Sequence, residues 1–377
     1  MDEPLTEWIE PATGHRVVRL SRESGTASLY FHQNAYTAEG DKMVVTTPRG
    51  LAALHLQTGE TAPLTEDRVS HVIVGKKSRR AFYIKDDTVY AADLDTGDTR
   101  AIVAHPELRS GSGLAINADE TLLAGSYVEG GIRPGPPPGA APPPGARGDS
   151  YPGKGAMMEQ RLAARLPMRL YTIEIATGAV HTFHPSTDWL NHVQFSPTDP
   201  TLLMFCHEGP WHKVDRIWTI RADGTQLTKI HARTMEMEIA GHEFFGADGK
   251  TIWYDLQTPR GKEFWLAGCV PATGETIRYR VEREHWSVHY IDSPDGTRFA
   301  GDGGGPRSVA APGNGQWIYL FTPRAGGLEA ERLVDLSDHD YSLEPNVTFT
   351  PDGQRLIFRS NLHGAPHVYA VEVKKRG

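Results

Sequence analysis

A short stretch between Phe205 and Trp218, FCHEGPWHKVDRIW, concentrates side chains that could do chemistry. Two imidazoles, two carboxylates and a guanidinium lie there among aromatic residues: His207, Glu208, His212, Asp215 and Arg216. A zinc-protease helix needs histidines at positions i and i+4 of one helical face, but these two are five residues apart across Gly209-Pro210. The pattern therefore predicts a strand, a turn and a second strand.

Three more histidines stand beside turns of similar sequence: His192 in WLNHVQFSP, His242 in AGHEFF and His289 in SVHYIDSPDG. A lone histidine in a strand is usually a hydrogen-bonded structural group. Histidines at matched positions of a repeat, however, meet near one channel when the repeats surround a common axis. We expect these three and His207 to approach one another on one face.

The repeat is a turn with Asp-Gly or an equivalent, an apolar strand, a second strand of alternating hydrophobicity, then Thr-Gly and a further strand. One copy reads SRRAFYIKDDTVYAADLDTGDTRAIV. About seven copies follow one another, and none could bury its hydrophobic face alone. The sequence therefore predicts an all-β protein, a seven-bladed β-propeller that forms a single domain over residues 1–377.

The N-terminal piece WIEPATGHRVVRLS has the pattern of outer strands. We expect it to join the last blade, whose inner strands are predicted between Asp352 and Val373, so that the two ends of the chain close the ring. A β protein of two domains is the alternative.

An insertion over residues 130–168 interrupts the third blade. It begins as a Pro/Gly-rich segment, GGIRPGPPPGAAPPPGARGDSYPGKG, and ends with a short predicted helix in MMEQRLAARLPMRLY. A surface loop is one interpretation. The other is a lid over the ligand site whose arginines reach an anion, namely Arg161, Arg165 or Arg169.

Composition excludes several classes of protein. A hydrophobic content of 39%, with 39 Gly, 27 Pro and a mean hydropathy of -0.43, is typical of a soluble, turn-rich protein. The net charge of -8 argues against a nucleic-acid partner, and no apolar run approaches the roughly 20 residues of a membrane span. The acidic start MDEPLTEWIE lacks a signal-peptide core, so we expect a cytoplasmic protein, or a periplasmic one if a signal peptide has been removed.

Motifs for the commonest metal and nucleotide sites are absent from the sequence. There is no CxxC, HExxH, calcium loop, G-x-S-x-G elbow or Walker loop, and GDGGGP at 301–306 lacks the lysine of a phosphate cradle. No nucleotide cofactor is expected. Cys206 and Cys269 are too few for a disulfide framework and are predicted to be buried thiols.

The residues resemble the oligogalacturonate lyases, a family of seven-bladed propeller enzymes that split short pectin fragments. The likeness spans nearly the whole chain and is strongest in WLNHVQFSP, FCHEGPWHKVDRIWTIRADGT, GHEFF, HYIDSPDGTRFAGDG and NVTFTPDGQRLIFRSNLHGAPHVYAVEV. It implies a small anionic oligosaccharide substrate, oligogalacturonate or a related oligouronide, that is cleaved by β-elimination to give a 4,5-unsaturated uronate.

In that reaction a base removes H5, which lies α to the C6 carboxylate, and the O4 substituent leaves. The carboxylate must be neutralised to stabilise the enolate-like intermediate. The resemblance makes His242 the base and Arg216 the partner of the substrate carboxylate, and it places the remaining substrate-binding candidates in the same pocket: His207, His192, Gln33 and Glu208.

A structural role stays open for three of these residues. Arg216 could form an ion pair with Asp215 or Glu208 instead of binding substrate, and His242 could hydrogen-bond a carbonyl in the core. Glu208 could orient a neighbouring histidine rather than react.

The chain departs from the resemblance at the metal. The family holds manganese with one histidine, which matches His289 here, and with a Gln-x-x-His-x-His cluster, which reads YSLEPN here. Tyr341, Glu344 and Asn346 thus stand at the positions of the other ligands. Oxygen from Glu344 and Asn346, with nitrogen from His289 and the nearby His339, could still hold Mn, Mg or Ca. A site without metal, in which arginine neutralises the carboxylate, is the alternative.

Two other functions compete with the lyase. A TolB-like propeller that is not an enzyme could hold carbohydrate or peptide over its channel, because propellers host many unrelated functions. A glycoside hydrolase would need two carboxylates beside the scissile bond, for which Glu208 and Glu243 are available.

Overall fold

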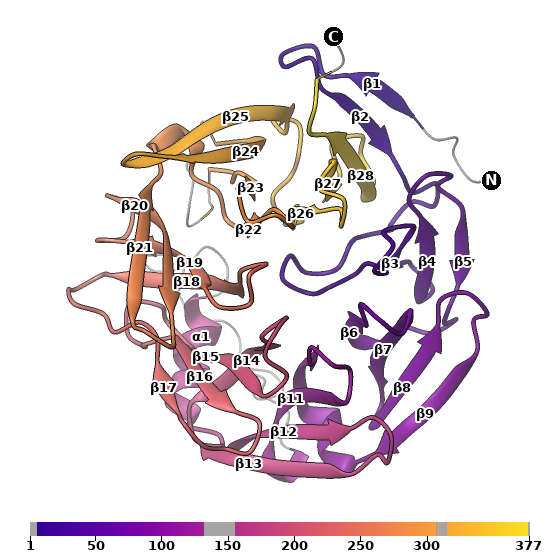
Figure 1. Ribbon diagram of the computed structural model, residues 1–377, viewed down its shortest axis with the longest axis vertical. Helices are drawn as coiled ribbons and strands as arrows, with labels where there is room; N and C mark the ends of the chain where they lie inside the picture. The colour runs from indigo at the N-terminus through magenta and orange to yellow at the C-terminus, as the bar shows by residue number, and fades with distance from the viewer. Residues whose placement is uncertain (1–5, 132–154, 307, 309–314, 376–377) are drawn as a thin grey trace.

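The computed structural model describes residues 6–131, 155–306, 308 and 315–375. The protein is all-β, and its sheets are arranged around a centre, with an edge strand of each sheet near the middle (Figure 1). Residues 132–154, the middle of the predicted insertion, lie outside the described residues. The predicted helix at its end is present as α1 (Gly155–Ala164), and within the described ranges no helix is long and apolar enough to cross a bilayer.

Neighbouring strands within the first half of the chain pair antiparallel in sequence order. One sheet comprises β3 (Lys42–Thr46), β4 (Leu51–His55) and β5 (Thr61–Pro63). The next holds β6 (Ser70–Val74), β7 (Arg80–Lys85), β8 (Thr88–Asp93) and β9 (Thr99–Ala104). A third holds β10 (Gly111–Ile116), β11 (Leu122–Val128), β12 (Met168–Glu174) and β13 (Val180–Ser186), with α1 in the connection between β11 and β12.

The second half repeats this order. One sheet holds β14 (Trp189–Phe195), β15 (Leu202–Glu208), β16 (Ile217–Arg221) and β17 (Thr228–Lys229). An eight-stranded sheet follows: β18 (Ile239–Phe245), β19 (Ile252–Gln257), β20 (Phe264–Val270), β21 (Glu275–Arg280), β22 (Tyr290–Asp292), β23 (Phe299–Gly301), β24 (Trp317–Arg324) and β25 (Gly327–Asp335). Its two antiparallel halves are joined by a single parallel pair, Arg280 with Gly327.

The expected pairing of the two ends of the chain is confirmed. β26 (Thr348–Phe349), β27 (Arg355–Ser360) and β28 (His367–Glu372) continue into β2 (Arg16–Arg19) and β1 (Glu7–Ile9), in the order β26-β27-β28-β2-β1. Val17 of β2 pairs with Val371 of β28. The N-terminal strands therefore form the outer edge of a sheet whose inner strands come from the C-terminal part of the chain (Figure 1).

The hydrophobic core lies between neighbouring sheets. One cluster joins Leu54 of β4 to Ile357 of β27, and another joins Leu320 of β24 to Tyr369 of β28; all four side chains are buried. The sheet that contains both ends of the chain thus packs against its neighbours on both sides. Because each sheet has two apolar faces, it needs two such neighbours to bury them.

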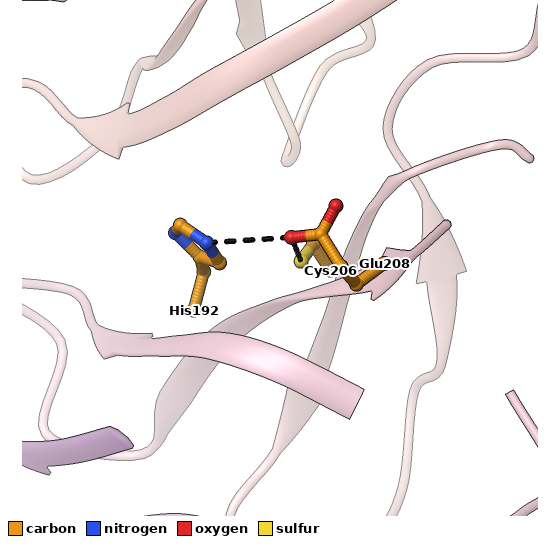
Figure 2. Close-up of side chains that lie close together, drawn as sticks. All are labelled: His192, Cys206 and Glu208. Carbon is orange, nitrogen blue, oxygen red and sulfur yellow. Dashed lines mark hydrogen bonds and ion pairs between the residues drawn. The ribbon is translucent and has the colours of Figure 1, made fainter. Parts of the chain in front are cut away.

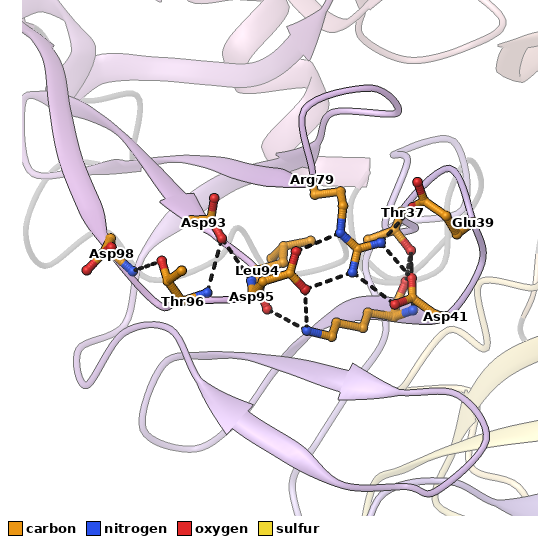
Figure 3. A network of polar contacts seen from close by, with 10 residues as sticks. Thr37, Glu39, Asp41, Arg79, Asp93, Leu94, Asp95, Thr96 and Asp98 are labelled. Atoms are coloured by element: carbon orange, nitrogen blue, oxygen red, sulfur yellow. Dashed lines mark hydrogen bonds and ion pairs between the residues drawn. The ribbon is translucent and has the colours of Figure 1, made fainter.

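An ion-pair network ties two neighbouring sheets together (Figure 3). The Arg79 guanidinium, before β7, lies 2.9 Å from a carboxylate oxygen of Asp41 and 2.7 Å from one of Asp95, and it also pairs with Glu39. Lys42 Nζ lies 2.6 Å from Asp95. All of these groups are satisfied by one another, so the network is structural.

Inner strands carry a β-bulge at matched positions, and this feature places the site. The pairing register shifts between residues 70 and 73 in β6, 112 and 115 in β10, 191 and 194 in β14, and 241 and 244 in β18. In each bulge one residue has a positive φ: His71 (53°), Gly113 (74°), His192 (50°) and His242 (44°). A bulge bends the strand and redirects the side chain at that point, and a positive φ is unfavourable for histidine unless the surroundings impose it. The repeat thus places His71, His192 and His242 at equivalent points of their inner strands.

Candidate active site

Three of the four predicted histidines are connected through one central loop. The rings of His242 and His289 have centroids 4.6 Å apart. Tyr30, in the loop between β2 and β3, contacts His289 at 5.3 Å and His192 at 5.6 Å, and the next residue, Phe31, lies 4.7 Å from the His289 ring. This loop reaches the middle of the molecule in Figure 1. The convergence expected for His192, His242 and His289 is therefore present.

His207 is not brought into this group. It precedes Glu208 in β15, and consecutive side chains of a strand point to opposite faces. Its ring lies against Trp218, at 4.9 Å, and its Nδ1 is 3.7 Å from Asp188. Burial, as the largest cause, lowers the pKa of His207 to about 4, so this imidazole is neutral at pH 7.

His242 has the geometry of a general base. Its Nδ1 lies 2.8 Å from Oδ1 of Asp255 in β19, a carboxylate that is 1% exposed. A carboxylate can only accept here, so Nδ1 carries the proton and Nε2 holds the lone pair. Burial lowers the pKa of His242 below its ordinary value of 6.5, although Asp255 acts in the opposite direction. The imidazole is therefore neutral at pH 7 and can accept a proton at Nε2.

His289 is held in the same way but in a different electrostatic environment. Its Nδ1 lies 2.6 Å from Asp302, which also accepts a hydrogen bond from the His289 backbone N–H at 2.8 Å. Burial lowers the pKa of His289, but Asp302 and Glu344 outweigh burial, and the pKa is raised. Nε2 is buried without a hydrogen-bond partner and lies 3.9 Å from the Glu344 carboxylate.

Arg216 lies beside the histidines between two carboxylates. Nη1 pairs with Glu208, and Nη2 lies 3.3 Å from both carboxylate oxygens of Glu243. The guanidinium carbon is 4.6 Å from the Trp211 ring, whose centroid is 4.8 Å from that of His242. The ion pair with Glu208 that the sequence also allowed is therefore present. Arg216 is 2% exposed, and only Nε lacks a partner.

Two carboxylates share this one guanidinium, and their ionisation bears on the glycosidase alternative. Burial, the largest single cause, raises the pKa of Glu208 and of Glu243, but Arg216 and His192 together outweigh it and both pKa values are lowered. A glycoside hydrolase needs one carboxylic acid that stays protonated near neutral pH. The lowered pKa values disfavour this role for either carboxylate.

A group formed by the half-buried His192 and the buried Cys206 and Glu208 could hold a metal ion (Figure 2). His192 Nε2 lies 3.4 Å from Glu208, and the Cys206 sulfur lies 3.9 Å from the same carboxylate oxygen. Glu208 is also the partner of Arg216, and burial raises the pKa of the Cys206 thiol well above its ordinary value. A protonated thiol beside a guanidinium is a poor environment for a hard cation such as Mn²⁺.

The predicted metal ligands differ in their availability. His289 offers a buried Nε2 without a partner, with Nδ1 fixed by a carboxylate as in many metal-bound histidines. Glu344 offers a half-buried carboxylate beside it. Asn346 uses Oδ1 to accept from Phe31 N–H at 3.1 Å and Nδ2 to donate to a backbone carbonyl. The residues thus fit a divalent cation held by His289 and Glu344, with the remaining ligands supplied by water or substrate.

His339 and Tyr341 are engaged elsewhere. The ring nitrogens of His339 lie 2.8 Å from Ser360 Oγ and 2.7 Å from the Leu343 carbonyl oxygen. The Tyr341 hydroxyl donates to the Asp302 carbonyl oxygen at 3.2 Å. Both side chains therefore support the wall of the site.

Gln33 supports the central loop. Its Oε1 accepts from Tyr30 N–H at 3.4 Å, and its own N–H donates to the Tyr30 carbonyl oxygen at 2.9 Å. These bonds close the turn that presents Tyr30 and Phe31.

The three arginines of the lid interpretation have other contacts. Arg165 lies 2.5 Å from Asp188 and Arg169 lies 2.7 Å from Glu129. Arg161, in α1, is buried against the Trp189 ring at 4.8 Å. The helix reaches the site indirectly, because Met158 packs with Trp211.

Sequence reasoning missed several residues that shape the site: Tyr30, His32, Asp255, Asp302 and Arg359. His32 lies 5.5 Å from His192 and 5.0 Å from Tyr30, and burial lowers its pKa well below 6.5. Asp255, in YDL, lies on the strand after the one with His242, and Asp302, in GDGGG, directly follows the strand that pairs with the one after His289. The predicted pairing of adjacent antiparallel strands could have indicated that each aspartate lies beside its histidine.

Comparison with known proteins identifies the family. The family model described as oligogalacturonate lyase matches residues 159–376, which is more than half of the chain. The chain belongs to the oligogalacturonate lyase family. It is 27% identical over 400 residues to an oligogalacturonide lyase of Pectobacterium atrosepticum, covering 98% of this chain and 97% of that protein. It is 26% identical over 392 residues to an oligogalacturonate lyase of Dickeya dadantii, covering 97% and 95%.

Solved structures of oligogalacturonate lyases share the fold. One, in complex with manganese, matches with a TM-score of 0.83 at 23% identity, covering 100% of this chain and 97% of that one. An oligogalacturonate lyase of Vibrio parahaemolyticus matches with a TM-score of 0.82 at 23% identity, covering 100% and 98%. The likeness at this identity concerns the fold.

Proposed function

We propose that this member of the oligogalacturonate lyase family cleaves short uronic-acid oligosaccharides, oligogalacturonate or a related oligouronide, by β-elimination. The observation that carries the proposal is the His242–Asp255 pair, a neutral imidazole with its proton fixed on Nδ1 and its lone pair on Nε2. Membership of the family and the match to oligogalacturonate lyases over nearly the whole chain support the same reaction.

In the proposed reaction, Nε2 of His242 accepts H5 of the sugar while the bond between C4 and its oxygen breaks. The electron pair of the C5–H bond becomes the C4–C5 double bond, while the electron pair of the C4–O bond leaves with the oxygen, which takes up a proton. The products are a 4,5-unsaturated uronate and the released sugar hydroxyl. The negative charge that develops next to C6 must be balanced by positive charge nearby, since H5 is barely acidic while the carboxylate is free.

Arg216 contributes to the reaction by holding other residues of the site in place. Its two terminal nitrogens already pair with Glu208 and Glu243, so a substrate carboxylate could reach it only by displacing one of them. We propose that Arg216 mainly fixes these carboxylates, while Glu208 orients His192. His192 and Gln33 remain candidates for contact with the sugar.

We propose His289 and Glu344 as the protein ligands of a divalent cation, Mn²⁺, Mg²⁺ or Ca²⁺. When bound, such a cation supplies positive charge that can neutralise the uronate carboxylate. The buried, unpartnered Nε2 of His289 and the manganese in a related lyase support this assignment.

We also propose that the antiparallel groups of strands form seven blades of one domain, closed into a ring by the β2–β28 pairing. Packing of the terminal sheet against both neighbours supports this arrangement. A ring of this kind would hold the bulges of successive inner strands at fixed positions around the site.

A panel of oligouronides tests the proposal. Purified protein is incubated with di- and trigalacturonate and with other uronate oligosaccharides, with and without added Mn²⁺, Mg²⁺ or Ca²⁺. We expect the ultraviolet absorbance of an unsaturated uronate to grow with time. No absorbance change with any substrate and any metal would contradict the proposal, and binding without cleavage would favour a carbohydrate-binding scaffold.

A further inference from the structure

Arg359 is a second arginine beside the histidines, and its contacts differ from those of Arg216. It lies near the end of β27 and is half-buried. Nε donates to the Glu344 carbonyl oxygen at 2.7 Å, and Nη1 donates to the Ser28 carbonyl oxygen at 3.1 Å. These neutral acceptors fix the plane of the guanidinium without neutralising its charge.

No carboxylate within the described part of the chain forms an ion pair with Arg359. Three other arginines have a different environment: Arg216 pairs with two glutamates, while Arg165 and Arg169 each pair with one carboxylate. Arg161 has no ion pair among the described residues either, but it lies against the Trp189 ring and the Met168 sulfur. Burying a cation is unfavourable unless an anion compensates it. Arg359 is therefore a half-buried positive charge that is held in place by two carbonyl oxygens and forms no ion pair with a described carboxylate.

The electrostatic neighbours of Arg359 belong to the site. Burial lowers the pKa of Arg359, and the charges of Glu344 and Asp302 act in the opposite direction. The Arg359 charge in turn acts on His289, whose ring lies 4.6 Å from that of His242. The Glu344 carboxylate lies 3.9 Å from His289 Nε2, while it is the backbone oxygen of Glu344 that holds Arg359.

We infer that Arg359 binds the C6 carboxylate of the uronate whose H5 is removed by His242. The assignment rests on the proposed function, and it makes the Arg359 guanidinium the protein group that neutralises the substrate carboxylate. A guanidinium held in one plane by two carbonyls can receive a carboxylate without reorganising, and it meets the negative charge that develops beside C6 during proton removal. Arg359 is then a substrate-binding residue whose contribution depends on the charge of the sugar acid.

Equilibrium binding tests the inference without requiring turnover. Galacturonate and its uncharged methyl ester, neither of which has a leaving group at O4 other than hydroxyl, are titrated by NMR into wild type, Arg359→Gln and Arg359→Lys. We expect Arg359→Gln to weaken galacturonate binding roughly tenfold or more and to change methyl ester binding by less than about twofold. The lysine variant should fall between wild type and glutamine, because it keeps the charge but not the fork.

A matched control comes from the same strand. Arg355, at the start of β27, also donates to a backbone carbonyl, that of Leu56 at 3.0 Å, and Arg355→Gln should leave the affinity for both sugars within about twofold of wild type. All titrations are repeated after chelation of metals, and the preference of wild type for the acid should persist.

The outcomes separate this inference from the proposed function. Equal weakening of acid and ester in Arg359→Gln would mean a structural defect, and unchanged acid binding would mean that another group holds the carboxylate; either result overturns the inference. Loss of the preference for the acid on chelation would assign the carboxylate to the metal and overturn it as well. An acid preference that depends on Arg359, in a protein that cleaves no oligouronide, would leave the inference standing and reject the lyase.

Discussion

Replacing Asp255 with asparagine removes the group that sets the tautomer of His242. The Asp255 carboxylate is buried and lies 2.8 Å from His242 Nδ1. A hydrogen bond to a charged group in such surroundings is worth about 1.5–3 kcal/mol, which corresponds to roughly a 10- to 100-fold change in rate if it is lost from the oriented base. Asparagine could also donate to Nδ1, which would leave the proton on Nε2. We therefore expect kcat/KM for digalacturonate to fall by about 10²- to 10⁴-fold.

The pH profile gives Asp255→Asn a second readout. Burial lowers the pKa of His242 below 6.5, so in wild type kcat/KM should fall on the acid side as His242 becomes protonated. Asp255 stabilises the protonated imidazole and raises this pKa. Without the carboxylate the pKa falls further, and the acid limb of the profile should move to lower pH while the plateau drops.

The assay is the initial rate of ultraviolet absorbance with digalacturonate between pH 4.5 and 8.5. Glu238→Gln is the matched control, because Glu238 forms a buried pair with His231 at 2.7 Å that contacts none of the clustered histidines. This control should change kcat/KM by less than about twofold wherever it is folded. A value for Asp255→Asn within about threefold of wild type, with an unchanged acid limb, would refute the reasoning.

Three further predictions follow from the contacts of the site. Glu208→Gln should destabilise the fold by about 3 kcal/mol in chemical denaturation, because it leaves the Arg216 charge partly unpaired. The pKa of Glu208 is lowered from 4.5 in the folded state, so the stability that wild type owes to this pair should be present above about pH 4.5 and decline as the pH falls below it. A stability difference between wild type and variant that stays constant from pH 7 to pH 3 would contradict this. Mn²⁺ should raise the melting temperature of wild type but not that of Glu344→Gln, and equal shifts would exclude Glu344 as a ligand. Both cysteine thiols should resist alkylation in the native protein at pH 8, since both are buried with raised pKa values, and rapid labelling would contradict that burial.

The fold could be predicted from the sequence because its signals are local and repeated. Each strand alternates apolar and polar residues, and Asp-Gly turns recur between strands. At Asp223-Gly224, the glycine has a φ of +87° and the Asp223 carboxylate accepts from Thr225 N–H at 2.9 Å. Such turns depend on residues that are adjacent in sequence, so they are legible without coordinates. The pairing of β2 with β28 was predictable because the N-terminal segment has the pattern of outer strands, and the inner strands that would complete its sheet are predicted at the other end of the chain.

Part of the site was also predictable from the repeat. Matched positions in successive sheets have the same bulge, and this brought His192 and His242 to one side. The misplacement of His207 has a simple reason: it is next to Glu208 in one strand, and alternation allows only one of the two to face the cluster. The opening stretch of the sequence therefore contributes to the site through Glu208 and Arg216 rather than through its histidines.

The remaining residues could not be predicted because they depend on contacts between distant segments. Tyr30 reaches His192 and His289 from a loop in the first part of the chain, and nothing in its local sequence indicates this. Arg359 is one of many arginines, and it is distinguished by carbonyl acceptors in two distant segments and by its closeness to the charges of Glu344 and Asp302. The pairing of Arg216 with two carboxylates depends on how β15, with Glu208, and β18, with Glu243, lie relative to each other in different sheets. This arrangement cannot be read from the sequence.

The most direct test of the account is the turnover of digalacturonate by His242→Ala, followed by absorbance of the unsaturated product alongside wild type at the same metal concentration. The account predicts that the variant remains folded and loses about 10²- to 10⁴-fold in kcat. Unchanged turnover by His242→Ala would show that another group removes H5, and the assignment of the site would have to be abandoned.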